Sequence, residues 1–205
     1  MAAASVVSAC GASHSPPRSG ARADRSFRVA VRTSFPAVQR LAEHSQLVID
    51  VRNTGTAALP NVAVTITNPR YHTAAEAFGE LIPPSGQGQP ILANRSRPIW
   101  IVTRNPGPCG YSCRQGGAGA AATAYSNTWA LGRLEPGATA RFAWSLTAIQ
   151  PGTYLVSYRV APGLSVDATA VGVDGRPAGG SLQVRISSAP RRAFVENDGR
   201  IVYSP

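Results

Sequence analysis

Two cysteines in the stretch PCGYSC are the residues of this 205-residue chain best placed for chemistry. Cys109 and Cys113 are four positions apart, too far for the C-x-x-C redox motif and too close to link distant strands. In an oxidising compartment they would close a small ring, worth about 2 kcal/mol on the chain-entropy estimate. One hypothesis is that this disulfide stiffens a recognition loop with Tyr111 at its tip, with Arg104 and Arg114 as further partner contacts. The alternative is local stabilisation alone, and both require export.

The third cysteine, Cys10, ends the sequence VSAC, which matches the end of a bacterial lipobox. In a lipobox an aliphatic residue and two small residues precede the cysteine, and a peptidase cuts just before the thiol that is lipidated. The apolar stretch before Cys10 is too short for export and contains no Lys or Arg. Either Met1 is internal to a longer reading frame, or Cys10 is a free thiol in a disordered tail. We favour the first and expect a lipid anchor on Cys10.

The histidines and carboxylates form no recognisable catalytic or metal-binding motif. No histidine has the spacing to Cys109 or Cys113 that zinc sites use, and no G-x-S-x-G sequence occurs. The sequences VDGR and ENDG are typical of hairpin turns rather than of calcium loops. We therefore expect no enzyme activity, no metal and no cofactor. The residues considered are His14, His44 and His72, the pair Glu76 and Glu80, and the pair Glu196 and Asp198.

The formal charge of +10 raises the question of an anionic partner. All 20 basic residues are arginines, and they are distributed from Arg18 to Arg200 with only Arg191 and Arg192 adjacent. No aromatic and basic residues alternate as a base-stacking surface requires. We therefore predict no nucleic-acid binding. A binder of anionic polymer stays as an alternative, and it predicts an affinity that falls steeply with salt.

Six segments alternate apolar and polar residues with a period of two, which predicts strands with one buried face. Turn residues separate them, which favours antiparallel pairing. A single sheet would leave its apolar face in water, so we predict an all-β fold with two antiparallel sheets packed face to face. The aromatic residues of the later segments should fill the space between the sheets. The segments are 26–33, 46–53, 61–68, 141–149, 152–160 and 181–187.

The alternating pattern breaks between Asn68 and Ser126, where only PIWIVT at 98–103 predicts a strand. HTAAEAFGEL at 72–81 predicts a short helix. Loops of this length in compact domains are functional or disordered. The predicted organisation is a signal remnant and flexible, disordered tether at 1–25, a sandwich at 26–190 with a long irregular insertion at 69–127, and a tail or short hairpin at 191–205.

The stretches VRNTGTAALPNVAVTITN and LGRLEPGATARFAWSLTAIQPGTYLVSYRVAPGL resemble the Ig-like modules of bacterial envelope proteins, of the CARDB type and its relatives in actinobacterial secreted proteins. The resemblance covers residues 26 to 190. It implies an Ig-like β-sandwich that holds or presents other parts at a cell surface, and it transfers no catalytic residue. Tyr154 matches the tyrosine-corner position, and Val156 stands where antibody domains have a cysteine.

These observations together predict an exported, non-catalytic module that binds or spaces something at the cell envelope, with residues 103 to 127 as the contact surface. Its partner would be an envelope protein or a cell-wall polymer, and it would touch the membrane only through the lipid on Cys10. We expect a monomer outside the cytoplasm. One further alternative is a carbohydrate- or ester-processing enzyme with its site in the insertion, at His72 or Glu76.

Overall fold

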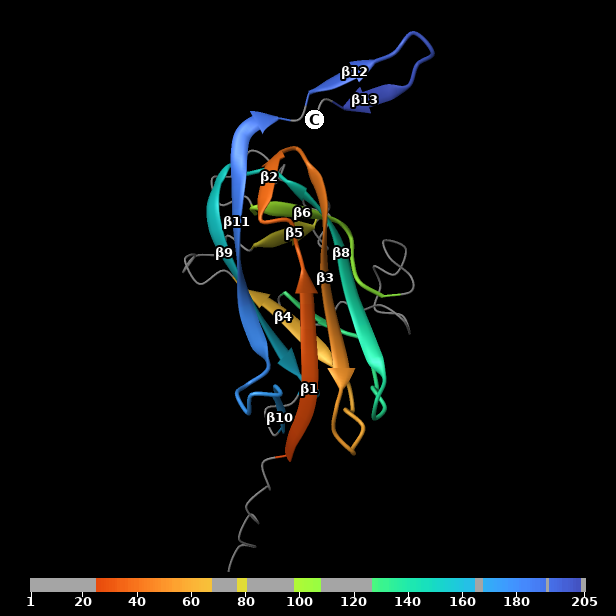
Figure 1. Cartoon of the computed structure of the whole chain (residues 1–205), viewed down its shortest axis with the longest axis vertical. Coiled ribbons are helices and arrows are strands. Elements are labelled where there is room, and N and C mark those ends of the chain that lie inside the picture. Colours follow the sequence, from red (N-terminus) through yellow and green to blue (C-terminus); the bar gives the residue numbers. More distant parts are fainter. Residues whose placement is uncertain are drawn as a thin grey trace, which may run out of the picture.

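The computed structural model describes residues 25–67, 77–80, 98–107, 127–164, 168–190 and 192–203. Within these ranges all regular elements are strands, β1 to β13, and Figure 1 shows their arrangement. Among the described residues no helix is long and apolar enough to span a bilayer. The predicted all-β fold is confirmed.

The first sheet has six strands in the order β10-β1-β3-β8-β6-β5. Its centre is an antiparallel set in which β3 lies between β1 and β8. The outer pairs β1–β10 and β5–β6 are parallel. The bounds are β1 Arg25–Ser34, β3 His44–Asn53, β5 Phe78–Glu80, β6 Trp100–Arg104, β8 Thr139–Ala148 and β10 Ala168–Val171.

The second sheet has five strands in the order β2-β11-β9-β4-β7, and its β2–β11 pair is parallel. Three parallel pairings therefore correct the prediction of purely antiparallel sheets. The chain enters each of the short edge strands β2, β5 and β10 from a strand of the other sheet. These strands can therefore pair in parallel without the helical crossover that joins parallel neighbours within one sheet. The bounds are β2 Val38–Leu41, β4 Ala63–Thr67, β7 Thr128–Ala130, β9 Gly152–Ala161 and β11 Gly179–Pro190, and a separate hairpin joins β12 Ala193–Val195 to β13 Ile201–Tyr203.

The two sheets pack face to face, because apolar side chains from both lie in one buried cluster. The alternation predicted the inward face of each of the six segments, and these predictions are confirmed. Three of the predicted inward side chains, Val31, Tyr158 and Leu182, are only partly buried and pack against the rim of the core. The fully buried members include Val29, Leu47, Ile49, Val51, Val64, Phe142, Trp144, Leu146, Val156 and Val184.

Strands of the predicted insertion enter this core. The strand predicted at 98–103 is confirmed as β6, which begins two residues later and ends one residue later than predicted. The helix predicted over 72–81 is wrong at 78–80, which form β5, and the insertion is not irregular throughout. Phe78 is buried with its ring centroid 6.1 Å from that of Trp100 and 6.2 Å from that of Trp144. This aromatic burial outweighs the local helix propensity.

Tyr154 forms a tyrosine corner at the start of β9. Its hydroxyl donates a hydrogen bond to the carbonyl oxygen of Pro151, 2.9 Å away and three residues upstream. Gly152 between them has φ of 150°, and a Cβ at that position would lie 2.8 Å from the Tyr154 hydroxyl oxygen. The sequence PGTY therefore fixes the entry of the chain into β9, because only glycine leaves room for the ring.

Candidate binding surface

Most residues predicted to form a site lie outside the described ranges. This applies to Cys10, Cys109, Tyr111, Cys113 and Arg114, and also to His72 and Glu76 of the alternative enzyme hypothesis. Arg104 is described and lies at the end of β6. The lipid anchor and the disulfide therefore stay predictions, and the site is built from the surroundings of Arg104.

The described residues offer little for catalysis. His44 Nδ1 lies 2.7 Å from Thr147 Oγ1 on the exposed surface, which is the only described contact of a histidine with a hydroxyl. The neighbouring Glu43 carboxylate accepts a hydrogen bond from the backbone N–H of Arg40 at 2.6 Å, so its Oε2 atom is engaged elsewhere. Within the described ranges no three His, Cys, Asp or Glu side chains come together as metal ligands would.

A row of charged side chains crosses the outer face of the six-stranded sheet. Arg32 on β1 is opposite Asp50 on β3, and Asp50 is opposite Arg141 on β8. Asp50 Oδ2 lies 3.8 Å from Arg141 Nη1, a long ion pair between partly exposed groups. Directly opposite residues on adjacent strands are about 5 Å apart, so Asp50 lies between Arg32 and Arg141 in this row and its ion pair is with Arg141.

Two shallow hollows lie beside this row. They have volumes of about 390 and 400 Å³ and share Gln46 and Arg141 as lining residues. Val48 and Ala143, which are opposite each other on β3 and β8, belong to the linings of the first and the second hollow respectively. Because Val48 and Ala143 have small side chains, the surface beside Gln46 and Arg141 stays open.

Arg104 reaches the second hollow because β6 is irregular at its end. The register against β8 shifts between Val102 and Arg104, which brings Arg104 opposite Ser145. Thr103 Oγ1 donates a hydrogen bond to the Ser145 carbonyl oxygen at 3.0 Å and holds this end of the strand. Without the shift, strict alternation would place residue 104 on the inward side with Val102.

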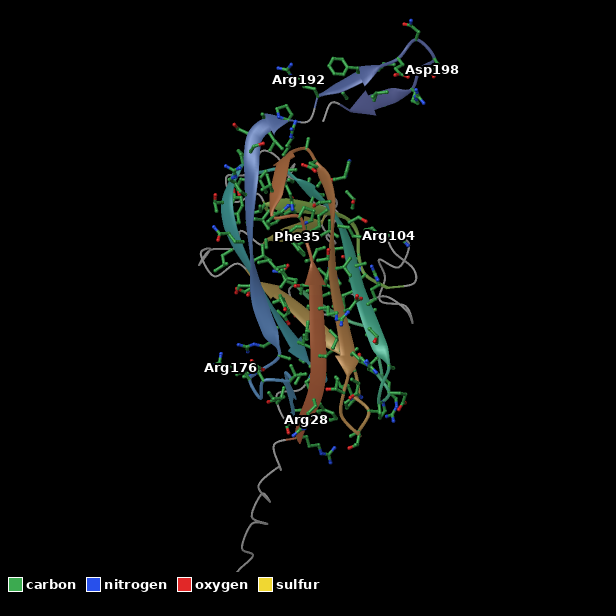
Figure 2. The ribbon with its side chains drawn as sticks, in the orientation of Figure 1. Arg28, Phe35, Arg104, Arg176, Arg192 and Asp198 are labelled. Atoms are coloured by element: carbon green, nitrogen blue, oxygen red, sulfur yellow. The ribbon has the colours of Figure 1, made fainter. Side chains whose placement is uncertain are left out.

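We call the exposed arginines on the outward side of β1, β3, β6 and β8 the arginine face. Asp50 is the one acidic residue directed outward from β1, β3 and β8. Figure 2 shows Arg28 near the start of β1 and Arg104 at the end of β6, so the arginine face runs obliquely over the sheet. Its members are Arg28, Arg32, Arg52, Arg104 and Arg141.

Of these five residues, only Arg104 was predicted from the sequence as a partner contact. The alternation already indicated that Arg28, Arg32 and Arg52 point away from the core. What the sequence did not contain is the order β1-β3-β8-β6, which brings Arg32, Arg141 and Arg104 from three separate segments to neighbouring hollows.

The outer face of the five-stranded sheet has a different character. Hydroxyl groups pair across its strands, with Thr65 Oγ1 2.9 Å from Thr128 Oγ1 and Ser157 Oγ 2.9 Å from Ser181 Oγ. The exposed arginines on this face are spread from one end of the sheet to the other. They are Arg40, Arg159 and Arg185, and they provide a matched set for comparison with the arginine face.

A second exposed surface is the hairpin of β12 and β13, which projects past the end of β11 in Figure 1. Among the described strands β12 and β13 pair only with each other. Phe194 and Val202 share one side of the hairpin, and Val195 and Ile201 share the other. All four are exposed, Val195 at 71%. The hairpin therefore presents apolar side chains on both sides.

Comparison with known proteins gives similarities of fold at a low level. No family model matches the sequence, and no curated protein matches it. A CARDB domain from Pyrococcus furiosus, solved in complex with di-metal ions, is 12% identical with a TM-score of 0.42 and covers 78% of this chain and 94% of that one. A Clostridium perfringens cohesin module of a family 33 glycoside hydrolase is 8% identical with a TM-score of 0.44, covering 80% and 99%.

Native alpha-2-macroglobulin from Escherichia coli, from domain MG7 to its C-terminus, is 11% identical with a TM-score of 0.42. The match covers 85% of this chain and 21% of that structure. These similarities assign no function to any residue of this chain.

Proposed function

We propose that this protein is an exported, non-catalytic β-sandwich module, anchored to the cell membrane through Cys10, that binds a partner at the envelope through the arginine face. The observation that carries the proposal is the arginine face itself, an open surface with five cations, three of which line the two hollows. Such a surface suits attachment to another molecule rather than turnover of a small substrate.

The position of the chain ends supports a tethered arrangement. β1 begins at one end of the sandwich and β11 finishes at the other, as Figure 1 shows. Residues 1–24 therefore join the sandwich at the β1 end, where the arginine face also begins with Arg28. A lipid on Cys10 would hold the module by that end and leave the long outer face of the sheet free for contact.

Sedimentation with cell envelopes tests the binding function. The 205-residue protein is incubated with purified envelopes of its host, and the bound fraction is compared between variants. We expect Arg32→Ser/Arg104→Ser/Arg141→Ser to lose most of the binding and Arg40→Ser/Arg159→Ser/Arg185→Ser to keep it, although both lower the charge equally. Equal retention of all three proteins would refute binding through the arginine face.

Export is tested separately in the host. Metabolic labelling with an alkyne fatty acid should label the wild-type protein and not a Cys10→Ser variant, which should be released from the membrane. Mass spectrometry of freshly exported protein should find Cys109 linked to Cys113. Absence of the fatty-acid label from wild-type protein would remove the anchor, and free thiols at both positions would remove the disulfide.

A further inference from the structure

We propose that the partner of the arginine face is a flexible polymer that carries repeated phosphate groups. This inference rests on the proposed function in that it takes the arginine face to be the binding surface, and it adds the chemical class of the ligand. The observations that carry it are the charges, their spacing and the residues that lie between them.

The charges favour a polyanion. This surface carries five exposed arginines and one aspartate. Arginine stays protonated at any physiological pH, and its planar guanidinium can bond two phosphate oxygens at once. Several weak contacts to one polymer release several counterions together, which gives useful affinity without an enclosed pocket.

The spacing favours a flexible chain. Arg32 and Arg141 lie two strands apart, so their backbones are separated by about 10 Å. Arg104 is opposite Ser145, which lies four residues from Arg141 along β8, so the backbones of Arg104 and Arg141 are offset by about 14 Å along the strand direction. A flexible polymer can place successive phosphates near these points, since each arginine side chain can swing over several ångströms.

The same surface disfavours other anionic macromolecules. β3 lies between β1 and β8, whereas among the described strands β1 pairs with β10 only at 25–28 and β8 pairs with β6 only at 145–148. An acidic peptide that added as a further strand would therefore lie beside β1 or β8, at the margin of the arginine face rather than across it. The outward residues of these three strands include no Phe, Tyr or Trp on which bases or sugar rings could stack. Recognition is therefore left to the anionic groups themselves.

Asp50 limits the affinity of this surface. Asp50 lies between Arg32 and Arg141 in the cross-strand register, and its carboxylate is 3.8 Å from the Arg141 guanidinium. It competes with a phosphate for that cation and repels the polymer. Asp50→Asn keeps the shape of the side chain and removes the negative charge, so binding should become stronger.

The experiment measures binding of the 205-residue protein to medium-chain inorganic polyphosphate by fluorescence anisotropy over a series of salt concentrations. Arg32→Ser/Arg104→Ser/Arg141→Ser should bind at least about tenfold more weakly and reduce the slope of log K against log salt by about 2. Asp50→Asn should bind about threefold more tightly at low salt. The matched variant Arg40→Ser/Arg159→Ser/Arg185→Ser should stay within about twofold of the wild type.

Several results would overturn the inference. These are equal losses in the two triple variants, an unchanged or lower affinity of Asp50→Asn, and affinity for poly-glutamate or a DNA duplex that equals or exceeds that for polyphosphate. Arginine-dependent retention on envelopes without binding to polyphosphate would refute this ligand class and leave the proposed function standing. Polyphosphate binding without retention on envelopes would refute the proposed function instead.

Discussion

Trp100 and Trp144 are both fully buried, and of their two indole N–H groups only that of Trp100 has a hydrogen-bond partner among the described residues. Trp100 Nε1 donates to the buried Gln39 Oε1 at 2.8 Å. Within the described part of the chain, the buried Trp144 Nε1 has no hydrogen-bond partner, and its ring stands edge-on to that of Trp129. The two tryptophans therefore contribute similar apolar burial but different polar contributions to stability.

Replacing each tryptophan with phenylalanine separates these contributions. Both variants lose a similar volume, but Trp100→Phe also leaves the Gln39 carbonyl oxygen without its indole donor. We expect Trp100→Phe to lower the free energy of unfolding by about 1–2 kcal/mol more than Trp144→Phe. Urea unfolding of the two variants measures the difference. A larger loss in Trp144→Phe would contradict the hydrogen-bond assignment.

Tyr158 makes the stability depend on alkaline pH. Burial raises the pKa of Tyr158 above its ordinary value of 10.0, and a hydrogen bond with Thr33 opposes part of that rise. Below pH 10 the hydroxyl is neutral in both states and its contribution is intact. Above pH 10 the unfolded chain ionises first, so stability falls as the pH rises toward the folded-state pKa.

Thermal unfolding between pH 8 and 11 checks this effect. The difference in stability between wild-type protein and Tyr158→Phe should be constant up to about pH 10 and should then shift in favour of the variant. The same pH dependence in both proteins would show that other groups cause the alkaline loss.

At the scale of the elements, local patterns predicted burial well and pairing poorly. The inward sets of the six alternating segments follow from the two-residue period of a strand, which is visible in sequence. The parallel pairings of β1 with β10 and β2 with β11 depend on segments over 100 residues apart. β5 was missed because Phe78 is fixed by aromatic contacts with distant strands rather than by its neighbours.

The start of β9 provides a prediction at this scale. Gly152→Ala places a methyl group against the Tyr154 ring and an L side chain at φ of 150°, and we expect a loss of about 1–3 kcal/mol. Gly163→Ala is the control, because no atom of the described residues lies within 4 Å of the added Cβ and its φ is outside the positive range that strains an L side chain. Urea unfolding that finds both variants as stable as the wild type would refute the tyrosine corner as a constraint.

At the scale of the whole molecule, the sheet order gathers charges that the sequence disperses. The 20 arginines form no tract along the chain. The order β1-β3-β8-β6 nevertheless brings together Arg32, Arg104 and Arg141, of which the first and last are 109 residues apart in the sequence. Dispersal of arginines along the sequence therefore does not predict their dispersal on the surface of a β-sandwich, because cross-strand neighbours come from distant segments.

The most direct test of binding through the arginine face is an NMR titration of the 205-residue protein with medium-chain polyphosphate, observing the arginine Nε–Hε signals. We predict progressive, salt-sensitive shifts for Arg32, Arg104 and Arg141, with the signals of Arg40, Arg159 and Arg185 almost unmoved. Shifts of equal size on both sheets, or shifts confined to the five-stranded sheet, would contradict the arginine face as the binding surface.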